Sequence, residues 1–309
     1  LAEMQELHRQ YGFVRFDFTH DNFTTSRKFV NDFCEYMEAH MPREFGWAAS
    51  SRTDCIDITR LERMNAIGCS GLFFGVESGS ERIQESMKKN LKLDKFEPIL
   101  ARAKELGMRC TTAFILGFPE ETEEDMDATV LRALHYRELG AHRIFFTKLT
   151  PLTGTSIYRD FVGQLSEFSS PSTLSQQRYG LPFVVELIRK YPDLFSSYYH
   201  VPHPRFSFDY LCKFTSFANH LIEGSPKAAR TVIENLDLGA TRLFELWKPW
   251  AEEREIVYVP YEEYPDSQFE VDFPQFLRDT VFSGLGESGA PPTRGAVRGG
   301  AEASLASTM

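Results

Sequence analysis

Polar side chains follow the ends of five strand-like segments in the first half of the chain. One of them alone would be an ordinary helix cap or a solvated charge. Because the carboxyl ends of parallel strands meet at one edge of a sheet, five in succession indicate a ring of groups at that edge. Such a ring could hold a ligand that carries an amine, a carboxylate and a ribose. In chain order the residues are His20, Asp21, Asn22, Arg52, Asp54, Glu77, Glu120, Glu121 and Lys148.

Glycines accompany two of these positions. Gly75 and Gly79 flank Glu77 in GVESGS, and Gly117 lies in ILGFPEET. Glycine adopts positive φ readily and lets a ligand approach the backbone closely. A carboxylate among glycines is suited to accept hydrogen bonds from ribose hydroxyls. The alternative interpretation of GVESGS is a tight turn from strand to helix with Ser80 as the N-cap, and both can hold at once.

Alternating strand and helix signals must position this ring. Strands separated by helices of about ten residues require right-handed crossovers, and therefore a parallel sheet. The continuous apolar run 71–76 is typical of a strand buried on both faces. Thr122 with Asp125 predicts a capping pair at the start of one helix. The expected strands are 13–18, 46–51, 71–76, 110–116 and 144–149, and the expected helices are 27–39, 57–67, 81–87, 94–106 and 122–139.

Five strands cannot close a barrel of eight, but with one strand missing at the start they would form a partial barrel of six. The expected fold class is therefore α/β, a partial (β/α)6 TIM-type barrel that lacks its first strand, with a mainly helical C-terminal extension. Three parts are predicted: the barrel over 1–159, the extension over 160–283 and a disordered tail over 284–309. The tail contains no aromatic residue and cannot bury enough apolar surface to order itself.

Composition excludes some functions. A formal charge of −10 argues against nucleic-acid binding through a broad basic surface. No apolar run approaches the roughly 20 residues needed to cross a bilayer, and the start does not resemble a signal peptide, so a cytoplasmic protein is expected. The two histidines of HVPHP, without a third ligand nearby, are interpreted as loop residues. Trp247 and Trp250 are predicted to pack in a core. The five cysteines, predicted to be buried and reduced, are Cys34, Cys55, Cys69, Cys110 and Cys212.

Five motifs, in order, resemble the radical S-adenosylmethionine (SAM) superfamily, and especially its methylthiotransferase-like and cobalamin-binding branch. The motifs are FDFTHDNFT, SSRTD, GVESGSERIQESMKKN, FILGFPEET and LTPLTGTSIY, and the resemblance covers residues 1–160. It implies a 4Fe-4S cluster, held by a CxxxCxxC loop, that reductively cleaves SAM to a 5′-deoxyadenosyl radical. It also implies an unidentified substrate and an electron donor such as flavodoxin or ferredoxin. A cobalamin-binding domain upstream is a further expectation from the family.

The resemblance assigns roles to the polar ring. Asp21 and Asn22 take the place of the family's Gly-Gly-Glu motif, which contacts the methionyl amine, although its glycines are absent. Arg52 matches a position that faces the methionyl carboxylate. Glu77, with Ser78 beside it, matches the polar group after the family's fourth strand, which contacts SAM, often at the ribose.

The FILGFPEET segment resembles the family's GxIxGxxE adenine motif. Ala113 stands in place of the first glycine and adds volume near the adenine. The positions that match the motif are Ile115, Gly117 and Glu120.

No CxxxCxxC occurs in the 309 residues. Apolar Leu1, Met4 and Leu7 already follow helical spacing, which predicts a chain truncated at its N-terminus and inactive without its cluster ligands. Two other hypotheses remain open. One is a barrel lyase or aldolase that uses Lys148 as a Schiff-base nucleophile, and the other is a degenerate, non-catalytic homologue.

Overall fold

The computed structural model describes residues 1–89, 91–167, 182–256 and 265–283. The chain divides into two compact units, Leu1–Thr215 and Ser216–Met309. The domain boundary expected at residue 159 remains a prediction. The expected disordered tail, 284–309, lies outside the described residues.

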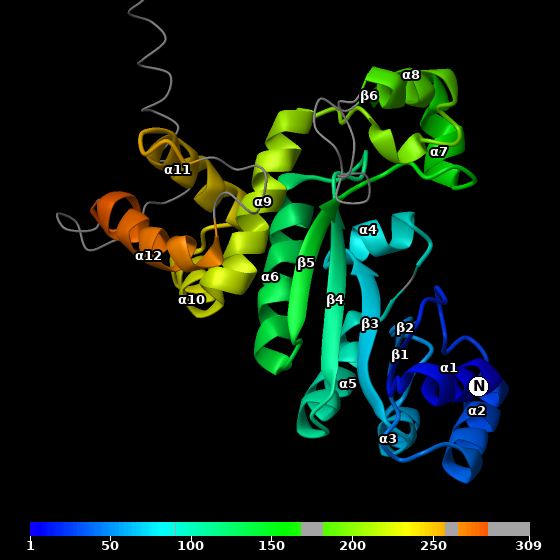
Figure 1. The fold of residues 1–309 in the computed structure, drawn as a ribbon. Helices are drawn as coiled ribbons and strands as arrows, with labels where there is room; N and C mark the ends of the chain where they lie inside the picture. Colours follow the sequence, from blue (N-terminus) through cyan, green and yellow to red (C-terminus); the bar gives the residue numbers. More distant parts are fainter. Residues whose placement is uncertain (90, 168–181, 257–264, 284–309) are drawn as a thin grey trace, which may run out of the picture. The chain divides into compact units, whose positions relative to one another are not determined.

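The first unit is built on one parallel sheet whose strands follow the chain order β1-β2-β3-β4-β5 (Figure 1). Parallel pairing of β1 with β2 joins Arg15 to Gly46 and Phe18 to Ala49, as the partial barrel requires. The two outer strands each have one neighbour among the described residues, so the sheet is an open arc. The α/β partial-barrel fold class is thereby confirmed. The strands are β1 (Arg15–Phe18), β2 (Gly46–Ser51), β3 (Cys69–Glu77), β4 (Arg109–Leu116) and β5 (Arg143–Lys148).

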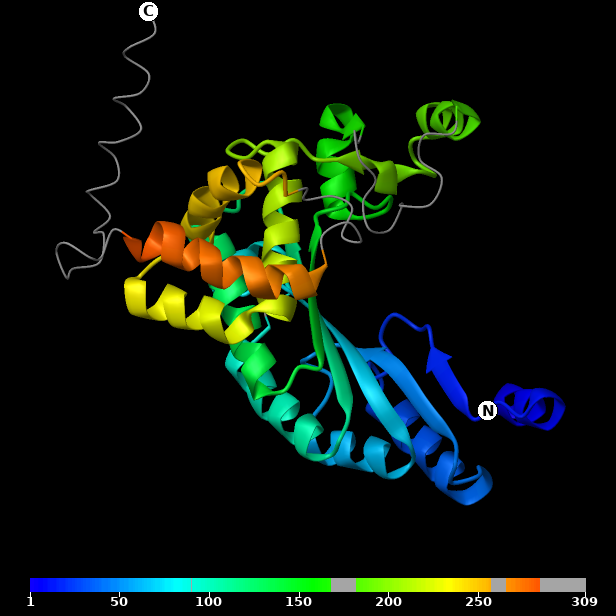
Figure 2. The ribbon, with the colours of Figure 1, turned by 60° about the vertical axis from the view of Figure 1, so that its left-hand side comes forward.

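Helices cover one face of this sheet, called here the outer face (Figures 1 and 2). Alternate strand residues such as Leu72, Phe74 and Phe114 are buried there, and Phe74 meets Phe96 with 4.7 Å between ring centroids. Side-chain caps fix several helix starts; the predicted Thr122–Asp125 capping box is present. The helices are α1 (Ala2–Tyr11), α2 (Arg27–His40), α3 (Ile58–Ala66), α4 (Glu81–Ser86), α5 (Leu93–Glu105) and α6 (Glu123–Leu139).

The opposite face, called here the inner face, departs from the expectation for segment 71–76. Leu72, Phe74 and Val76 are buried, but Phe73 is 36% exposed. The prediction of burial on both faces was therefore wrong, because no second layer covers Phe73 among the described residues. The inner face of the sheet is open to a ligand.

Short elements follow β5 in the first unit. A two-stranded antiparallel ribbon joins Ser166 to His200. These elements are α7 (Ser156–Phe161), η1 (Val162–Gln164), β6 (Ser166–Glu167), α8 (Pro182–Lys190), η2 (Ser196–Tyr198) and β7 (Tyr199–His200), followed by α9 (Phe208–Gly224), which continues into the second unit.

The second unit is helical, as the extension was predicted to be. Trp247 is buried, with ring centroids 5.2 Å from both Phe269 and Phe276. Trp250 also packs in this core and donates a 3.1 Å hydrogen bond to Asp279. The core role predicted for both tryptophans is confirmed. None of the described helices is both long and apolar enough to span a membrane. The elements are α10 (Pro226–Leu236), α11 (Ala240–Glu252), α12 (Asp266–Phe276) and η3 (Leu277–Val281).

Candidate functional site

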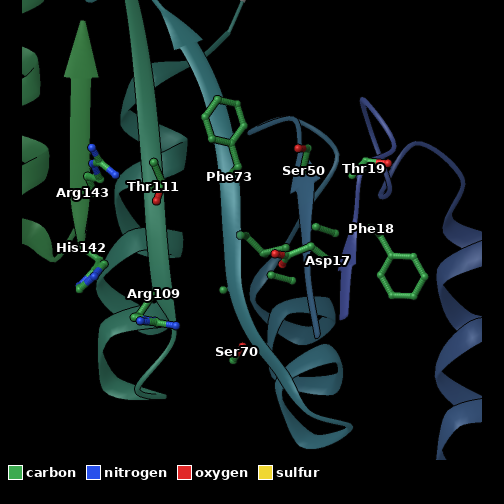
Figure 3. Close-up of a pocket in the computed structure, with 14 residues that line it drawn as sticks. Asp17, Phe18, Thr19, Ser50, Ser70, Phe73, Arg109, Thr111, His142 and Arg143 are labelled. Atoms are coloured by element: carbon green, nitrogen blue, oxygen red, sulfur yellow. The ribbon is translucent and has the colours of Figure 1, made fainter. Parts of the chain in front are cut away.

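The inner face of the sheet carries a cavity of about 540 Å³ (Figure 3). The residues that line it come from all five strands of the sheet and from the positions next to their ends. Ala48, Ser50 and Gly71 are small residues of the cavity lining and leave the space above the sheet free. A β-carbon on Gly71 would meet the Arg109 carbonyl oxygen at 2.6 Å, so a larger residue does not fit there. The cavity lies along the middle and amino-terminal parts of the strands, whereas the predicted ring lies at their carboxyl ends.

The exits of β1 and β2 are joined by hydrogen bonds. The Phe23 amide donates to the Ser50 carbonyl at 2.9 Å, and the Thr24 and Ser51 hydroxyls lie 2.6 Å apart. The Asn22 amide nitrogen is 3.8 Å from the Cys55 sulfur, and its oxygen accepts from Thr24 at 3.2 Å. Asn22 is thus held between the two exits.

Asp21 and Arg52 both lie at this edge. Asp21 is exposed, and its side chain has no hydrogen-bond or ion-pair partner in the described part of the chain. Arg52 forms a two-pronged contact with Asp54, Nε to Oδ1 at 2.9 Å and Nη2 to Oδ2 at 2.8 Å. The Arg52 guanidinium lowers the pKa of Asp54, and Asp54 raises the pKa of Arg52. Arg52 therefore already presents its fork to a carboxylate, the group it was predicted to bind.

Glu77 ends β3 in an uncommon backbone conformation, with φ of 70°. Its register with β4 shifts after Gly75, which is a local bulge. A β-carbon on Gly75 would lie 2.4 Å from Glu77 Oε1, so glycine is needed for the carboxylate to fold back over the strand. Glu77 Oε1 accepts a 2.6 Å hydrogen bond from Lys89 Nζ, which also donates to the Gly75 carbonyl at 2.6 Å.

Lys89 packs back against the sheet instead of extending into solvent at the end of α4. Its side chain is only 14% exposed, and that of Glu77 is 24% exposed. The turn after α4, with Lys88 at φ 56°, returns Lys89 toward the sheet. The salt bridge holds the Glu77 carboxylate in place at the carboxyl end of the inner face.

Ser78 contributes to the scaffold of the site through its side chain. It is fully buried, with its hydroxyl 3.1 Å from that of Thr129 on α6 and accepting from the Ser80 amide at 3.1 Å. The Gln84 amide donates to the Ser78 carbonyl at 2.6 Å. A ligand at this position would meet the backbone of the turn, because the hydroxyl faces α6.

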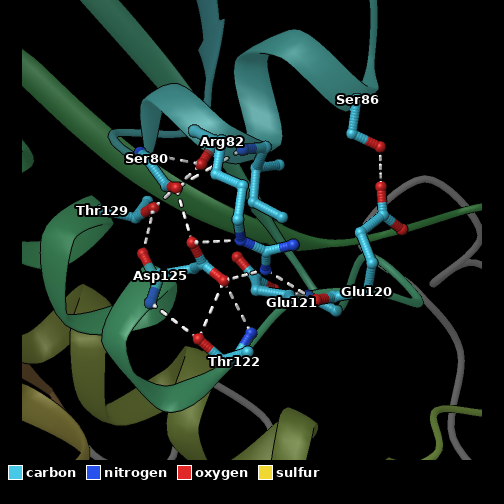
Figure 4. A network of polar contacts seen from close by, with 11 residues as sticks. Ser80, Arg82, Ser86, Glu120, Glu121, Thr122, Asp125 and Thr129 are labelled. Atoms are coloured by element: carbon cyan, nitrogen blue, oxygen red, sulfur yellow. Dashed lines mark hydrogen bonds and ion pairs between the residues drawn. The ribbon is translucent and has the colours of Figure 1, made fainter.

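Asp125 connects the turn after β3 to helix α6 (Figure 4). It accepts from the Ser80 hydroxyl at 2.6 Å, from the Thr122 amide at 2.8 Å, and forms an ion pair with Arg82. Burial raises the pKa of Asp125, but the hydrogen bonds from Arg82, Ser80 and Thr122 outweigh it and lower the pKa to about 2. The strand exits of β3 and β4 are thereby held together by one carboxylate.

The turn after β4 is fixed by Glu121. Gly117 has φ of 93°, and its amide donates to Glu121 Oε2 at 2.6 Å. The Glu121 side chain is fully buried, and its Oε1 has no hydrogen-bond partner among the described residues. Burial raises its pKa to about 8. In the sequence Glu121 was named only as a member of the polar ring, and the family motif was matched to its neighbour Glu120.

Glu120, the acid matched to the adenine motif, lies on the surface. Its carboxylate accepts from the Ser86 hydroxyl, and its carbonyl accepts from Arg82 at 2.7 Å. Ile115 is half-buried on the inner face, where it pairs with Thr147 of β5. The structure therefore brings Glu77, Ile115 and Gly117 to one end of one face, and places Glu120 beside α4.

Lys148 is half-buried at the end of β5. Its ammonium lies 5.7 Å from the centre of the Phe208 ring. Burial raises the pKa of the Cys212 thiol, and the nearby Lys148 opposes that shift. These contacts describe a packed lysine and give no specific support to Schiff-base chemistry.

The described residues contain no group of three or more His, Cys, Asp or Glu side chains that could hold a metal ion. Cys34, Cys69 and Cys110 are buried, and burial raises the pKa of all three thiols, that of Cys110 to about 12. His200, predicted to lie in a loop, is in the short strand β7, where its ring centroid is 4.0 Å from that of Phe208; His203 does lie in a loop, and its Nδ1 accepts from two backbone amides. A 4Fe-4S cluster does not fit these side chains.

Comparisons with known proteins agree with the geometry. The model of the radical SAM superfamily matches residues 1–133. An uncharacterized methyltransferase of Pyrococcus horikoshii is 31% identical over 158 residues, which cover 51% of this chain and 34% of that protein. Cytidylyl-2-hydroxyethylphosphonate methyltransferase of Streptomyces wedmorensis is 28% identical over 172 residues, 52% of this chain and 31% of that protein. The chain thus spans about a third of the length of these relatives.

Among solved structures, the chain is similar to the radical SAM methyltransferase TsrM of Kitasatospora setae, determined with cobalamin and a [4Fe-4S] cluster bound. The two are 20% identical, with a TM-score of 0.46, over 55% of this chain and 36% of TsrM.

Proposed function

Because the model of the radical SAM superfamily matches residues 1–133, we propose that the chain binds SAM across the carboxyl ends of its parallel strands, as part of a radical SAM methyl-transfer enzyme. The observation that carries the proposal is the convergence of Glu77 and the Gly117 turn. They end neighbouring, paired strands on the open inner face. The two methyltransferase relatives support the reaction class.

In this arrangement Glu77 accepts hydrogen bonds from the ribose hydroxyls while Lys89 fixes its other side. The positive φ of Gly117 lets the adenine approach the backbone, and Ile115 offers an apolar wall. Arg52 binds the methionyl carboxylate by exchanging its contact with Asp54. Asp21, exposed and without an ion-pair partner in the described chain, receives the methionyl ammonium next to Asn22.

The finer activity, reductive cleavage of SAM to a 5′-deoxyadenosyl radical that modifies an unidentified substrate, belongs to the same proposal for the whole protein. A 4Fe-4S cluster would supply the electron for that cleavage, and a flavodoxin or ferredoxin would reduce it. Cobalamin, bound in TsrM, is proposed as a further cofactor of the whole protein. The described side chains offer no set of cluster ligands, so no step of this chemistry is assigned to them.

SAM binding by the chain itself tests the proposal without any turnover. Glu77→Gln removes the charge that faces the ribose, and a hydrogen bond to a charged group contributes about 1.5–3 kcal/mol. The dissociation constant for SAM, measured by calorimetry, should rise by about tenfold or more. Glu38→Gln, an exposed glutamate of α2, is the matched control and should leave the affinity unchanged.

Gly117→Ala provides an independent test at the other strand. A β-carbon there is strained at φ 93° and lies 3.1 Å from a Leu211 methyl group. Gly107→Ala is the matched control, because Gly107 also has positive φ, at 71°, but its β-carbon would meet nothing within 4 Å. Both substitutions should lower stability by about 1 kcal/mol or more, but only Gly117→Ala should weaken SAM binding. Equal SAM affinity in Glu77→Gln, Gly117→Ala and the unaltered chain would refute the proposed site.

A further inference from the structure

Three side chains that can carry positive charge lie together at the amino-terminal end of the inner face. Arg109 begins β4, Arg143 begins β5, and His142 precedes it. Arg143 pairs with Thr111, two positions after Arg109 on the same face of β4. The two arginines are therefore diagonal neighbours on adjacent strands, and all three side chains line the cavity (Figure 3). We call them the basic cluster.

The basic cluster lacks the acidic partners that many other arginines of this unit have. Arg82, Arg102 and Arg132 each form an ion pair with a carboxylate. In contrast, none of the three cluster side chains has a hydrogen-bond or ion-pair partner among residues 1–89, 91–167, 182–256 and 265–283. In a chain of net charge −10, this is a local concentration of uncompensated positive charge.

The remaining acid of the cavity lies at a distance from the cluster. Asp17 is the single acidic side chain among the described residues that line the cavity, and it is on β1. Two strands separate β1 from β4, so at about 4.8 Å per strand Asp17 lies about 14 Å from the cluster. It cannot neutralise the arginines, but it could accept a hydrogen bond from a hydroxyl or amine of the same ligand.

An aromatic surface lies between the basic cluster and the strand exits. Phe73 is 36% exposed, and its ring centroid is 6.0 Å from that of Phe145 on β5. Around it the floor is low, because Ala48, Ser50 and Gly71 are small. A planar ring or an apolar segment of a ligand could stack there.

The register gives the length of the ligand that would use the whole face. Gly71 pairs with Arg109, and Glu77 follows six residues later on the same strand. At about 3.3 Å per residue, the basic cluster and the strand exits are about 20 Å apart. This is about twice the length of a mononucleotide, so a ligand that used the whole face would be elongated, with a charged group at one end and the reacting atom at the other.

We propose that the basic cluster binds the phosphoryl group of an elongated, phosphate-bearing substrate. Arg109 and Arg143 bind the phosphate oxygens, because guanidinium groups match phosphate geometry. Phe73 supports the middle of the molecule. The anion site stands without SAM, but its assignment to the substrate rests on the proposed function, since only then does chemistry occur at the strand exits.

Uridine 5′-monophosphate, inorganic pyrophosphate and uridine are suitable probes, titrated by calorimetry at low ionic strength. Uridine 5′-monophosphate should bind saturably, and uridine at least tenfold more weakly. The double variant Arg109→Gln/Arg143→Gln should bind the monophosphate and pyrophosphate at least tenfold more weakly. Phe73→Leu should weaken the binding of uridine 5′-monophosphate and leave the binding of pyrophosphate unchanged. Arg27→Gln, at an exposed arginine of α2, is the matched control and should have no effect.

Two results would overturn the inference. The first is that neither phosphate compound binds saturably. The second is an equal loss of affinity in the double variant and in Arg27→Gln, which would indicate a general ionic attraction. SAM titrations keep the two proposals apart. The double variant should keep its affinity for SAM, and Glu77→Gln should keep its affinity for the nucleotide. Failure of one site therefore leaves the other measurement intact.

Discussion

At the scale of single residues, the buried carboxylate of Glu121 is the most unusual feature of the site. A fully buried carboxylate normally has several hydrogen-bond donors, but here Oε2 has the Gly117 amide and Oε1 has no partner in the described structure. Burial of such a group disfavours its charged form and raises its pKa, here from 4.5 to about 8. The turn that would meet the adenine is thus held by a group that is protonated over much of the neutral range.

This pKa gives a pH dependence of stability with a definite sign. Between about pH 4.5 and 8 the folded chain retains a proton on Glu121 that the unfolded chain has lost. The stabilising contribution of protonated Glu121 to the free energy of unfolding is therefore complete below the pKa of the unfolded chain. It is lost as pH rises through the pKa of the folded chain. The free energy of unfolding should fall between pH 5 and 8, and Glu121→Gln should flatten that fall by on the order of 1–3 kcal/mol.

Urea denaturation at pH 5, 6, 7 and 8 measures this effect. Glu38→Gln, at an exposed carboxylate of α2 that is not among the groups acting on the pKa of Glu121, is the control and should leave the pH profile as it is. An unchanged slope in Glu121→Gln would show that burial does not perturb this carboxyl group in solution.

Residues also mark where sequence reasoning ended. Glu120 and Glu121 have the same chemistry and adjacent positions, so their burial depends on how the Gly117 turn folds. Lys89 follows a short helix, and only the backbone reversal at Lys88 directs it to Glu77. Contacts of this kind depend on tertiary geometry that periodicity does not encode.

At the scale of elements, prediction from sequence was much more successful. All five strands and the five helices named between them are present, with ends within about two residues of the expected ones. The reason is physical: the outer face must bury every second strand residue against helices with apolar stripes, and both periods are visible in the sequence. The inner face obeys no such constraint, so the exposure of Phe73 could not be foreseen.

The Asp125 contacts couple two of these elements, and their removal should cost stability. Asp125→Asn removes the negative charge that pairs with Arg82 and accepts hydrogen bonds from Ser80 and Thr122. Since Asp125 is 8% exposed but Arg82 is 52% exposed, solvent screens part of the pair and the loss should be about 1–2 kcal/mol at pH 7. Because the pKa of Asp125 is lower in the folded chain, its ionised carboxylate stabilises the fold above about pH 3.8. This contribution disappears as pH falls through about 2.

Thermal or urea unfolding of Asp125→Asn tests this coupling. Asp94→Asn, which alters an ion pair with Arg132 at a carboxylate that is 81% exposed, is the matched control and should cost less than about 0.5 kcal/mol. Equal stability of the two variants at pH 7 would contradict the role of Asp125. The difference should also shrink as pH approaches 2.

At the scale of the molecule, the open inner face contains both proposed binding regions. The two arginines of the basic cluster are 34 positions apart, and each alone is an ordinary exposed residue in the sequence. Only the strand order and register place them side by side. The net charge of the chain argued against a broad basic surface, but a net charge does not reveal a small local cluster of basic residues.

The positions of the cysteines lead to the last prediction, which concerns iron. All five cysteines lie in the described residues, and three of them are buried. Cluster ligands must be thiolates, and burial raises the pKa of those three thiols further. Cys55, in the turn after β2, and Cys212, on helix α9, are the two more accessible ones.

The chain, reconstituted with iron and sulfide, should therefore bind no stoichiometric 4Fe-4S cluster. Iron analysis and low-temperature electron paramagnetic resonance after reduction measure this directly. SAM affinity, which we propose to depend on Glu77 and the Gly117 turn, should be the same before and after the treatment. A cluster signal near one per chain that disappears in Cys55→Ser or Cys212→Ser would mean that the thiols rearrange, since a cluster needs ligands that these strands and helices hold apart.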